Sequence, residues 1–313
     1  MAEHAKTIEP ALVQGRGQLS DGEKWTATLV CVIAALAMRY AGQMALWPRD
    51  PALPVSLLTC RYPGLAMLEM MGLAAAAAAL VVAVIGKRLP GMGTLAVGAG
   101  LLAIGWSDAD WRPSIAYIQQ SSQSWSAMNV RLVGETLGWG MVILAGLIAE
   151  YLTREWLGLG EPGVSRVAVM YSRTSALVRA IVQSHEQWLM LTAAGLAGIV
   201  LIEILYANNV GAKLGQGYFI AGVAMMAGVL LGHQVFTVKA AWPAALAWLV
   251  PALAGRVWAI FGADRAASWM LTGINPLADM LPIQYAAGGT MGGIIGLWLS
   301  YKVMRWRGEQ QKG

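Results

Sequence analysis

Charged residues are scarce in this chain of 313 residues: they make up 12% of it, whereas hydrophobic residues make up 57%. A soluble domain carries about a quarter charged residues. So little charge cannot cover so much apolar mass, which argues against a soluble enzyme, a secreted disulfide scaffold and a disordered chain. The composition therefore predicts an integral membrane protein.

Cysteine and histidine are also rare, with two and three copies. Cys31 lies in an apolar stretch and Cys60 in a loop that we expect on the opposite side, so we predict two free thiols. Of the histidines, only His233 falls in an apolar segment, which argues against haem ligation by a histidine pair. The sequence lacks an H-E-x-x-H motif, a G-x-S-x-G motif, a Walker loop and His or Cys pairs at metal-ligand spacing. We therefore expect no metal and no cofactor, and the residues favour a non-enzymatic role.

Eight apolar segments stand out, each near the roughly 20 residues that a transmembrane helix needs. Their apolar runs are continuous rather than alternating, which is typical of membrane helices and not of barrel strands. They cover residues 25–46, 64–86, 90–106, 134–153, 188–206, 216–236, 243–261 and 281–303. The sequence thus predicts an all-α, polytopic membrane bundle of eight spans.

The basic residues predict the orientation of these spans. With the N-terminus inside, fourteen of the 22 lysines and arginines fall on cytoplasmic segments, six on outer loops, and Arg39 and Arg256 within spans. Cytoplasmic loops carry the excess of Lys and Arg in membrane proteins, so we expect both termini to be cytoplasmic in a bacterial-type inner membrane. We attribute the net charge of +5 to segments that face anionic lipid, not to nucleic-acid binding.

Four short motifs recur in order in the two halves of the chain. They are E-x-W before the first and fifth spans, a proline opening the third and seventh, Ala-Asp after these two spans, and G-x-T-x-G in the fourth and eighth. We therefore predict tandem four-helix halves, residues 25–156 and 188–303, related by an axis along the membrane normal. The remaining segments are predicted to be cytosolic: an N-terminal tail (1–24), a basic amphipathic linker helix (157–187) and a C-terminal tail (304–313).

Ionisable side chains inside spans are costly, and they are therefore functional candidates. The helical rise of about 1.5 Å per residue places Arg39, Glu69, Glu203 and Arg256 in one layer in the outer half of the bundle. One interpretation is a substrate- or ion-binding site with Arg39–Glu69 and Glu203–Arg256 as pairs. The other is that these pairs only fix neighbouring helices.

Three further ionisable residues lie nearer the ends of the spans. Glu150 and His233 lie near the inner ends, where they are either hydrated or part of a proton relay. Glu135 lies at the outer lip of the fourth span, and we expect it at the membrane interface.

Glycines recur every four residues in three spans, which lets two helix backbones approach closely. They are Gly134 and Gly138, Gly228 and Gly232, and Gly288, Gly292 and Gly296. We interpret the fourth and eighth spans as the contact between the halves. A permeation path lined by glycine is the alternative.

Three short motifs lie in the first half of the chain: Y-A-G at residues 40–42, L-E-x-x-G at 68–72 and G-K-R at 86–88. With them, residues 32–106 resemble the DoxX-type family of four-helix membrane proteins, although leucine follows the L-E-x-x-G motif where the family has a second glycine. The resemblance implies that Glu69 is the family's acidic position. It also implies a small membrane subunit linked to redox partners.

Two functions fit these observations. The leading hypothesis is a small-solute or ion permease, because a parallel repeat places buried charges in one layer. The alternative is a non-catalytic subunit of a larger membrane complex, because the interior is rich in glycine and poor in reactive groups. A permease needs a water-accessible cavity that reaches the four charges, whereas a subunit keeps them dry and offers a broad apolar flank. The expected partners are the lipid bilayer and either other membrane proteins or further copies of the chain.

Overall fold

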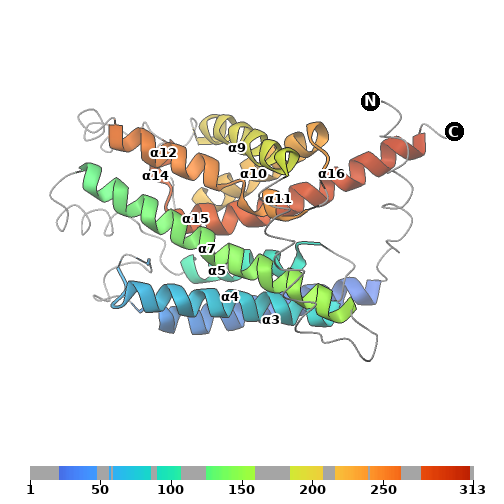
Figure 1. The fold of residues 1–313 in the computed structure, drawn as a ribbon, viewed down its shortest axis with the longest axis horizontal. Coiled ribbons are helices and arrows are strands. Elements are labelled where there is room, and N and C mark those ends of the chain that lie inside the picture. The colour runs from blue at the N-terminus through green and yellow to red at the C-terminus, as the bar shows by residue number, and fades with distance from the viewer. Residues whose placement is uncertain are drawn as a thin grey trace.

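The computed structural model describes residues 21–47, 56–57, 59–85, 90–106, 125–158, 184–206, 216–238, 240–261 and 276–310. The regular elements in these ranges are helices, most of which run along the long axis of the molecule (Figure 1). They are α3 (Asp21–Ala45), α4 (Pro63–Ile85), α5 (Met92–Gly105), α7 (Trp125–Gly158), α9 (His185–Tyr206), α10 (Gln216–Val235), α11 (Trp242–Leu246), α12 (Leu249–Phe261), α14 (Pro276–Asp279), α15 (Pro282–Gln284), the π-helix η1 (Tyr285–Gly289) and α16 (Thr290–Gln310). The predicted all-α class is confirmed.

Six helical stretches are long and apolar enough to cross a membrane. They are Lys24–Ala45, Pro63–Ile85, Ser126–Leu157, His185–Tyr206, Gln216–Val235 and Trp242–Phe261. Two further predicted spans correspond to α5, which has only 14 residues, and to α16, whose C-terminal third is charged. Both lie among the other helices in the bundle (Figure 1). A multi-pass membrane protein is therefore confirmed, and the count of eight spans stays a prediction.

Some predicted boundaries differ from the helices. α7 begins at Trp125, nine residues before the predicted span, because Met128 and Leu132 continue its buried stripe. α16 runs on to Gln310, into the predicted C-terminal tail. Most of the predicted N-terminal tail and linker helix lies outside the described residues.

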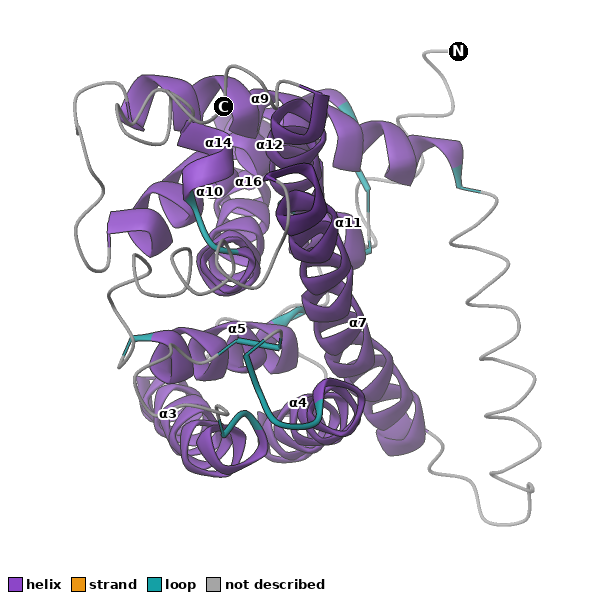
Figure 2. Cartoon of the chain, turned by 90° about the vertical axis from the view of Figure 1, so that its left-hand side faces the viewer, coloured by secondary structure: helices purple, strands orange, loops and turns teal. Residues whose placement is uncertain are grey.

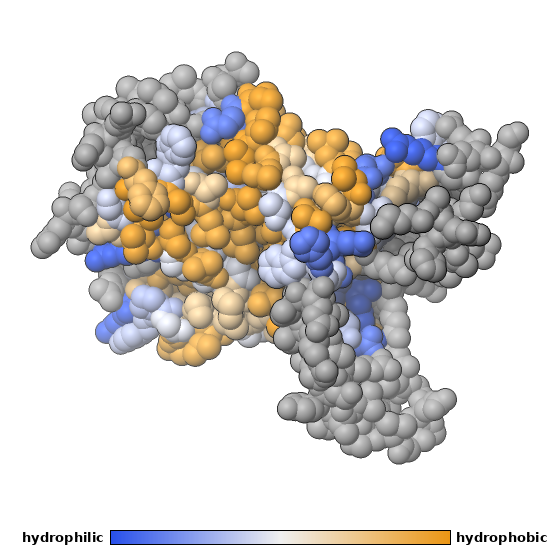
Figure 3. Space-filling model, turned by 45° about the horizontal axis from the view of Figure 1, so that its top comes forward, coloured by the Kyte–Doolittle hydropathy of each residue, from blue (hydrophilic) through white to orange (hydrophobic). Residues whose placement is uncertain are grey.

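Exposed aromatic side chains gather at the two ends of the long helices. Trp25, Trp156, Trp188 and Trp306 lie at one end, and Trp47, Tyr62, Trp106 and Trp258 at the other. Between these ends the exposed side chains are mainly aliphatic, and Figure 3 shows the apolar surface that they form. Such aromatic belts are typical of the two membrane–water interfaces. The start of α3 and the end of α16 lie at the same end of the bundle (Figure 1).

The helices form two groups that follow chain order, with α3, α4 and α5 on one side and α9, α10, α12 and α16 on the other (Figure 2). The long helix α7 packs on α4 in the first group and on α12 in the second. α5 also contacts α16 and η1, so the groups meet along two seams. The duplication of the chain stays a prediction.

The glycine stripes lie at different seams from the one we expected. A Cβ atom added at Gly288, Gly292 or Gly296 would overlap a backbone carbonyl oxygen of α10, and one added at Gly228 would meet the carbonyl oxygen of Ala194 in α9. Gly232 also lies against α9. In α7, Gly138 packs on Leu57, and Gly134 has nothing within 4 Å. These glycines therefore let α9, α10 and α16 pack closely, and the predicted contact between the fourth and eighth spans is wrong for them. Glycine spacing shows that a close neighbour fits, but it does not show which helix that neighbour is.

Candidate functional site

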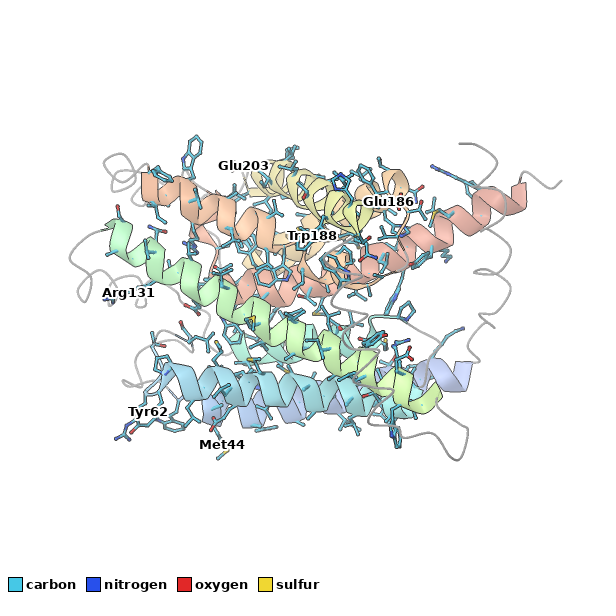
Figure 4. The ribbon with its side chains drawn as sticks, in the orientation of Figure 1. Met44, Tyr62, Arg131, Glu186, Trp188 and Glu203 are labelled. Carbon is cyan, nitrogen blue, oxygen red and sulfur yellow. The ribbon has the colours of Figure 1, made fainter. Side chains whose placement is uncertain are left out.

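The four charged residues predicted to share one layer do not converge on one site. Arg39 is half-buried on α3 and Glu69 is exposed on α4, while Glu203 is exposed on α9. Neither predicted pair forms between the described side chains. An ion pair does form between Arg154 and Glu150, at the other end of the bundle. Counting residues gives depth along a helix, but not the direction in which a side chain points. Figure 4 shows Glu203 on the upper surface of the bundle, opposite the surface that holds Met44 of α3.

Arg256 is the member of this layer that lies inside the protein, with 3% of its surface exposed. Its Nη1 atom donates to the carbonyl oxygen of Ala278 at 2.6 Å, and its Nη2 atom donates to that of Met280. The hydroxyl of Tyr285 donates to the carbonyl oxygen of Leu277 at 3.1 Å. Carbonyl groups at the end of a helix lack partners within it. Arg256 and Tyr285 thus supply donors to the end of α14 and hold this segment against α12.

Glu135 is buried, with 4% of its surface exposed, contrary to our expectation of an interfacial side chain. Its Oε1 atom accepts hydrogen bonds from Ser56 Oγ at 2.8 Å and from Trp139 Nε1 at 3.1 Å. The backbone N–H of Leu57 also donates to this carboxylate, and the positive charge of Arg256 attracts it. The segment before α4 therefore covers the outer end of α7. Glu135 and Arg256 place opposite charges on either side of the α7–α12 seam.

Glu150 caps the start of α5 at the other end of the bundle. Its Oε1 atom accepts from the N–H of Gly91 at 2.6 Å, and its Oε2 atom accepts from the N–H and the hydroxyl of Thr94 at 2.9 and 2.8 Å. Arg154, one turn along α7, pairs with Oε1 at 2.9 Å. A carboxylate at a helix N-terminus satisfies free N–H groups and interacts well with the helix dipole. With both oxygens engaged, Glu150 is a structural cap in this arrangement.

His233 lies in a buried network that joins α10 to α16. Its Nε2 atom lies 2.9 Å from the carbonyl oxygen of Val238, which can only accept, so Nε2 carries the proton. Its Nδ1 atom lies 2.9 Å from the hydroxyl oxygen of Ser300. Tyr301 packs edge-on against the ring and also donates to Val238 at 3.1 Å. These contacts hold the turn after α10, and no hydrogen bond between described residues links them to the outer layer.

Two neighbouring helical segments of the second group, α11–α12 and η1–α16, are interrupted. One breaks between α11 and α12, and the other contains η1. The breaks touch: Thr290 Oγ1 donates to the carbonyl oxygen of Ala245 at 3.2 Å, and a Cβ atom added at Gly289 would overlap the side chain of Trp248. Trp248 is fully buried, and its Nε1 atom has no hydrogen-bond partner among the described residues. Interrupted helices and π-helical turns are frequent at binding sites in membrane proteins.

A surface depression of about 660 Å³ opens at the N-terminal end of α4. It is lined by Arg61, Tyr62, Pro63, Gly64 and Leu65, and none of the four predicted charges lines it. Within the described ranges, no group of three or more His, Cys, Asp or Glu residues could hold a metal ion. Cys31 and Cys60 are buried and are not linked by a disulfide.

The helical bundle, its six long apolar helices and its aromatic belts define a multi-pass membrane protein in contact with the lipid bilayer. Comparison with known proteins assigns no family, since no family model, no curated protein and no solved structure matches the chain.

Proposed function

We propose that this chain is a non-catalytic integral membrane subunit that assembles with other membrane-spanning chains. The observation that supports this function is the exposure of Glu69 and Glu203, and the partial exposure of Arg39, on apolar helices. A charged side chain at the centre of a membrane helix costs about 2.5–3.5 kcal/mol on insertion scales, and less toward the interface. A neighbouring chain with a complementary group lowers this cost.

The three residues differ in depth. Glu203 lies three residues from the end of α9, or about 4.5 Å, so its carboxylate can reach the interface. Glu69 lies six residues inside α4, and Arg39 lies six residues from the end of α3, about 9 Å in each case. Arg39 and Glu69 therefore have the greater need of a partner.

The second line of support is the resemblance of residues 32–106 to the DoxX-type family. That resemblance implies a small membrane subunit with redox-linked partners and places Glu69 at the family's acidic position. The proposed role thus needs no catalytic group in this chain.

We also propose cytoplasmic termini in a bacterial-type inner membrane. At the end of the bundle where α3 starts and α16 finishes lie Lys24, Arg154, Lys302 and Arg307, whereas Arg61 and Arg131 lie at the other end. This bias follows the excess of Lys and Arg on the cytoplasmic side of membrane proteins.

Purification of a tagged chain from native membranes with charge variants tests the proposed function. We expect stoichiometric membrane-protein partners with the wild type, and partner recovery reduced severalfold by Glu69→Gln or Arg39→Gln. Glu186→Gln is the matched control, because Glu186 is exposed but lies in the first turn of α9, at the interface. Recovery of the chain as a single copy, with neither a second copy nor another polypeptide, in every case would contradict the proposal.

The interrupted helices favour a second candidate function, a small-solute or ion permease. The binding groups would then be those at the break, with the indole N–H of Trp248 as a donor. Proteoliposomes containing a pH-sensitive dye test this function for protons. Under it we expect proton flux that Trp248→Phe reduces severalfold, because phenylalanine lacks the N–H. Flux equal to that of empty liposomes would exclude a proton permease.

A further inference from the structure

The outward surface of α3 and α4 carries large exposed side chains on both helices, with two small residues one turn apart on α4. Leu29, Leu36 and Tyr40 are exposed on α3, and Gly72 and Ala76 are exposed on α4. The two helices lie side by side along one edge of the molecule (Figure 2). No helix of the described part of the chain covers this surface, which we call the α3–α4 face.

The two small residues of α4 have no neighbour in the described part of the chain. A Cβ atom at Gly72 would meet nothing within 4 Å, whereas one at Gly292 would overlap the backbone of α10. Small residues at four-residue spacing let membrane helices pack closely. The surface along Gly72 and Ala76 is therefore suited to another helix.

Arg39 and Glu69 give the α3–α4 face one cation and one anion at similar depth. Gly42 of α3 packs beside Met70 of α4, with 3.2 Å between its added Cβ atom and the sulfur. Arg39 lies three residues inward from Gly42, and Glu69 lies one residue outward from Met70. At about 1.5 Å per residue, their Cα atoms differ in depth by roughly 6 Å, about one helical turn. An arginine side chain spans a distance of this size.

We propose that the α3–α4 face binds a second copy of this chain about a two-fold axis along the membrane normal. Such an axis preserves depth and places α3 of each copy opposite α4 of the other. Arg39 of each copy then lies within reach of Glu69 of the other, and the two ion pairs are equivalent. This inference rests on the proposed function and identifies the partner that binds the α3–α4 face. Under the same proposal, Glu203 on α9 contacts a different membrane protein.

The sizes of the facing side chains agree with this symmetry. Because Gly42 is level with Met70, Tyr40 is level with Gly72, and Leu36 is level with Ala76. Across the two-fold axis these two large side chains of α3 therefore face small residues of α4, whereas Val32 and Met44 face Leu80 and Leu68. The face is complementary to itself in charge and, at these two levels, in size, which favours a second copy over an unrelated helix.

Cysteine cross-linking in native membranes tests the contact, in a background that carries Cys31→Ala and Cys60→Ala. Two differently tagged chains are co-expressed, one with Leu36→Cys and the other with Ala76→Cys, and the membranes are treated with a mild oxidant. We expect a disulfide-linked dimer that carries both tags. The control pair is Leu196→Cys on α9 with Met141→Cys on α7; both residues are exposed but lie outside the face, and we expect no such dimer.

Charge exchange tests the reciprocal ion pairs. Arg39→Glu alone or Glu69→Arg alone brings like charges together, and we expect each to lower the yield of cross-linked dimer roughly tenfold. The double exchange restores opposite charges at both contacts, and we expect the yield to return to within about threefold of the parent. Gly72→Leu places a large side chain at the proposed contact, and we expect it to lower the yield to a similar extent. Folding of a single copy should tolerate it, because Gly72 has nothing within 4 Å.

The outcomes separate this inference from the proposed function. Co-purification of other subunits without the tagged dimer would overturn the inference and leave the proposed function in place. A chain that neither cross-links nor co-purifies with any polypeptide would overturn both. A dimer that forms equally well in the single and double charge variants would refute the ion pairs, and with them the two-fold arrangement proposed here.

Discussion

Replacing Glu150 by alanine should destabilise the protein, because this side chain caps the start of α5. The substitution removes the acceptor for the N–H groups of Gly91 and Thr94, for the Thr94 hydroxyl and for Arg154. Glu150 is 5% exposed, so water cannot readily take its place. Thr94 is fully buried, so its donors are left without a partner.

The expected magnitude follows from these contacts. Each buried donor left without an acceptor costs about 1–3 kcal/mol, and loss of a helix cap costs about 0.5–2 kcal/mol. Arg154 is half-buried and can turn toward the interface, so its share is small. We expect Glu150→Ala to lower the free energy of unfolding by roughly 3–5 kcal/mol. Glu150→Gln keeps one acceptor oxygen but loses the charge, and about half of this loss is expected for it.

Thermal unfolding in lipid nanodiscs measures both variants against the wild type. The apparent Tm should fall in the order wild type, Glu150→Gln, Glu150→Ala. Glu155→Ala is a suitable control, because Glu155 lies on the same helix with part of its surface exposed. If the Tm of Glu150→Ala equalled that of the wild type, the capping role would be wrong. The result would instead favour the alternative prediction, that Glu150 is part of a proton relay.

Three further predictions concern the packing of the glycines, the hydrogen bonds of Arg256 to the α14 segment, and the orientation of the chain in the membrane. Gly292→Ala should lower the Tm by several degrees, because the added Cβ atom overlaps α10. Gly134→Ala should leave the Tm unchanged or raise it, because that site is open and alanine is more favourable than glycine in a helix by about 1 kcal/mol. Equal effects of the two variants on the Tm would refute this packing. Arg256→Met should lower the free energy of unfolding by roughly 2–4 kcal/mol and speed proteolysis near α14, since two carbonyl groups lose their donors. Protease resistance like that of the wild type would contradict the role of Arg256 in holding α14 against α12. In intact cells, a membrane-impermeant thiol reagent should label Arg131→Cys but not Glu186→Cys, and the opposite pattern would invert the topology.

The existence of the apolar helices was predictable because membrane crossing sets a length and a composition that a single segment must meet. The same reasoning also predicted spans at α5 and α16, where length or charge falls short, so these two spans stay predictions. Depth along a helix could be estimated from residue number alone, and the shared layer of Arg39, Glu69, Glu203 and Arg256 stays a prediction.

Direction around each helix was not predictable from spacing alone. Arg256 points inward and Glu203 outward, although both occur in apolar helices. Glu135 was assigned to the interface because nothing in the sequence indicates that Ser56 covers it. Glu150 and Thr94 lie 56 positions apart, so their hydrogen bond depends on how α5 and α7 pack. The one local signal was the spacing of Glu135 and Trp139 by four residues, which places them on one helix face.

The most direct measurement is the mass of the particle extracted from native membranes together with its surrounding lipid. For a subunit that assembles through its exposed charges, we expect native mass spectrometry to show particles heavier than the 33.2 kDa chain, with a second copy or other chains in fixed stoichiometry. A single 33.2 kDa polypeptide with bound lipid alone, unchanged by Glu69→Gln, would contradict the proposed role.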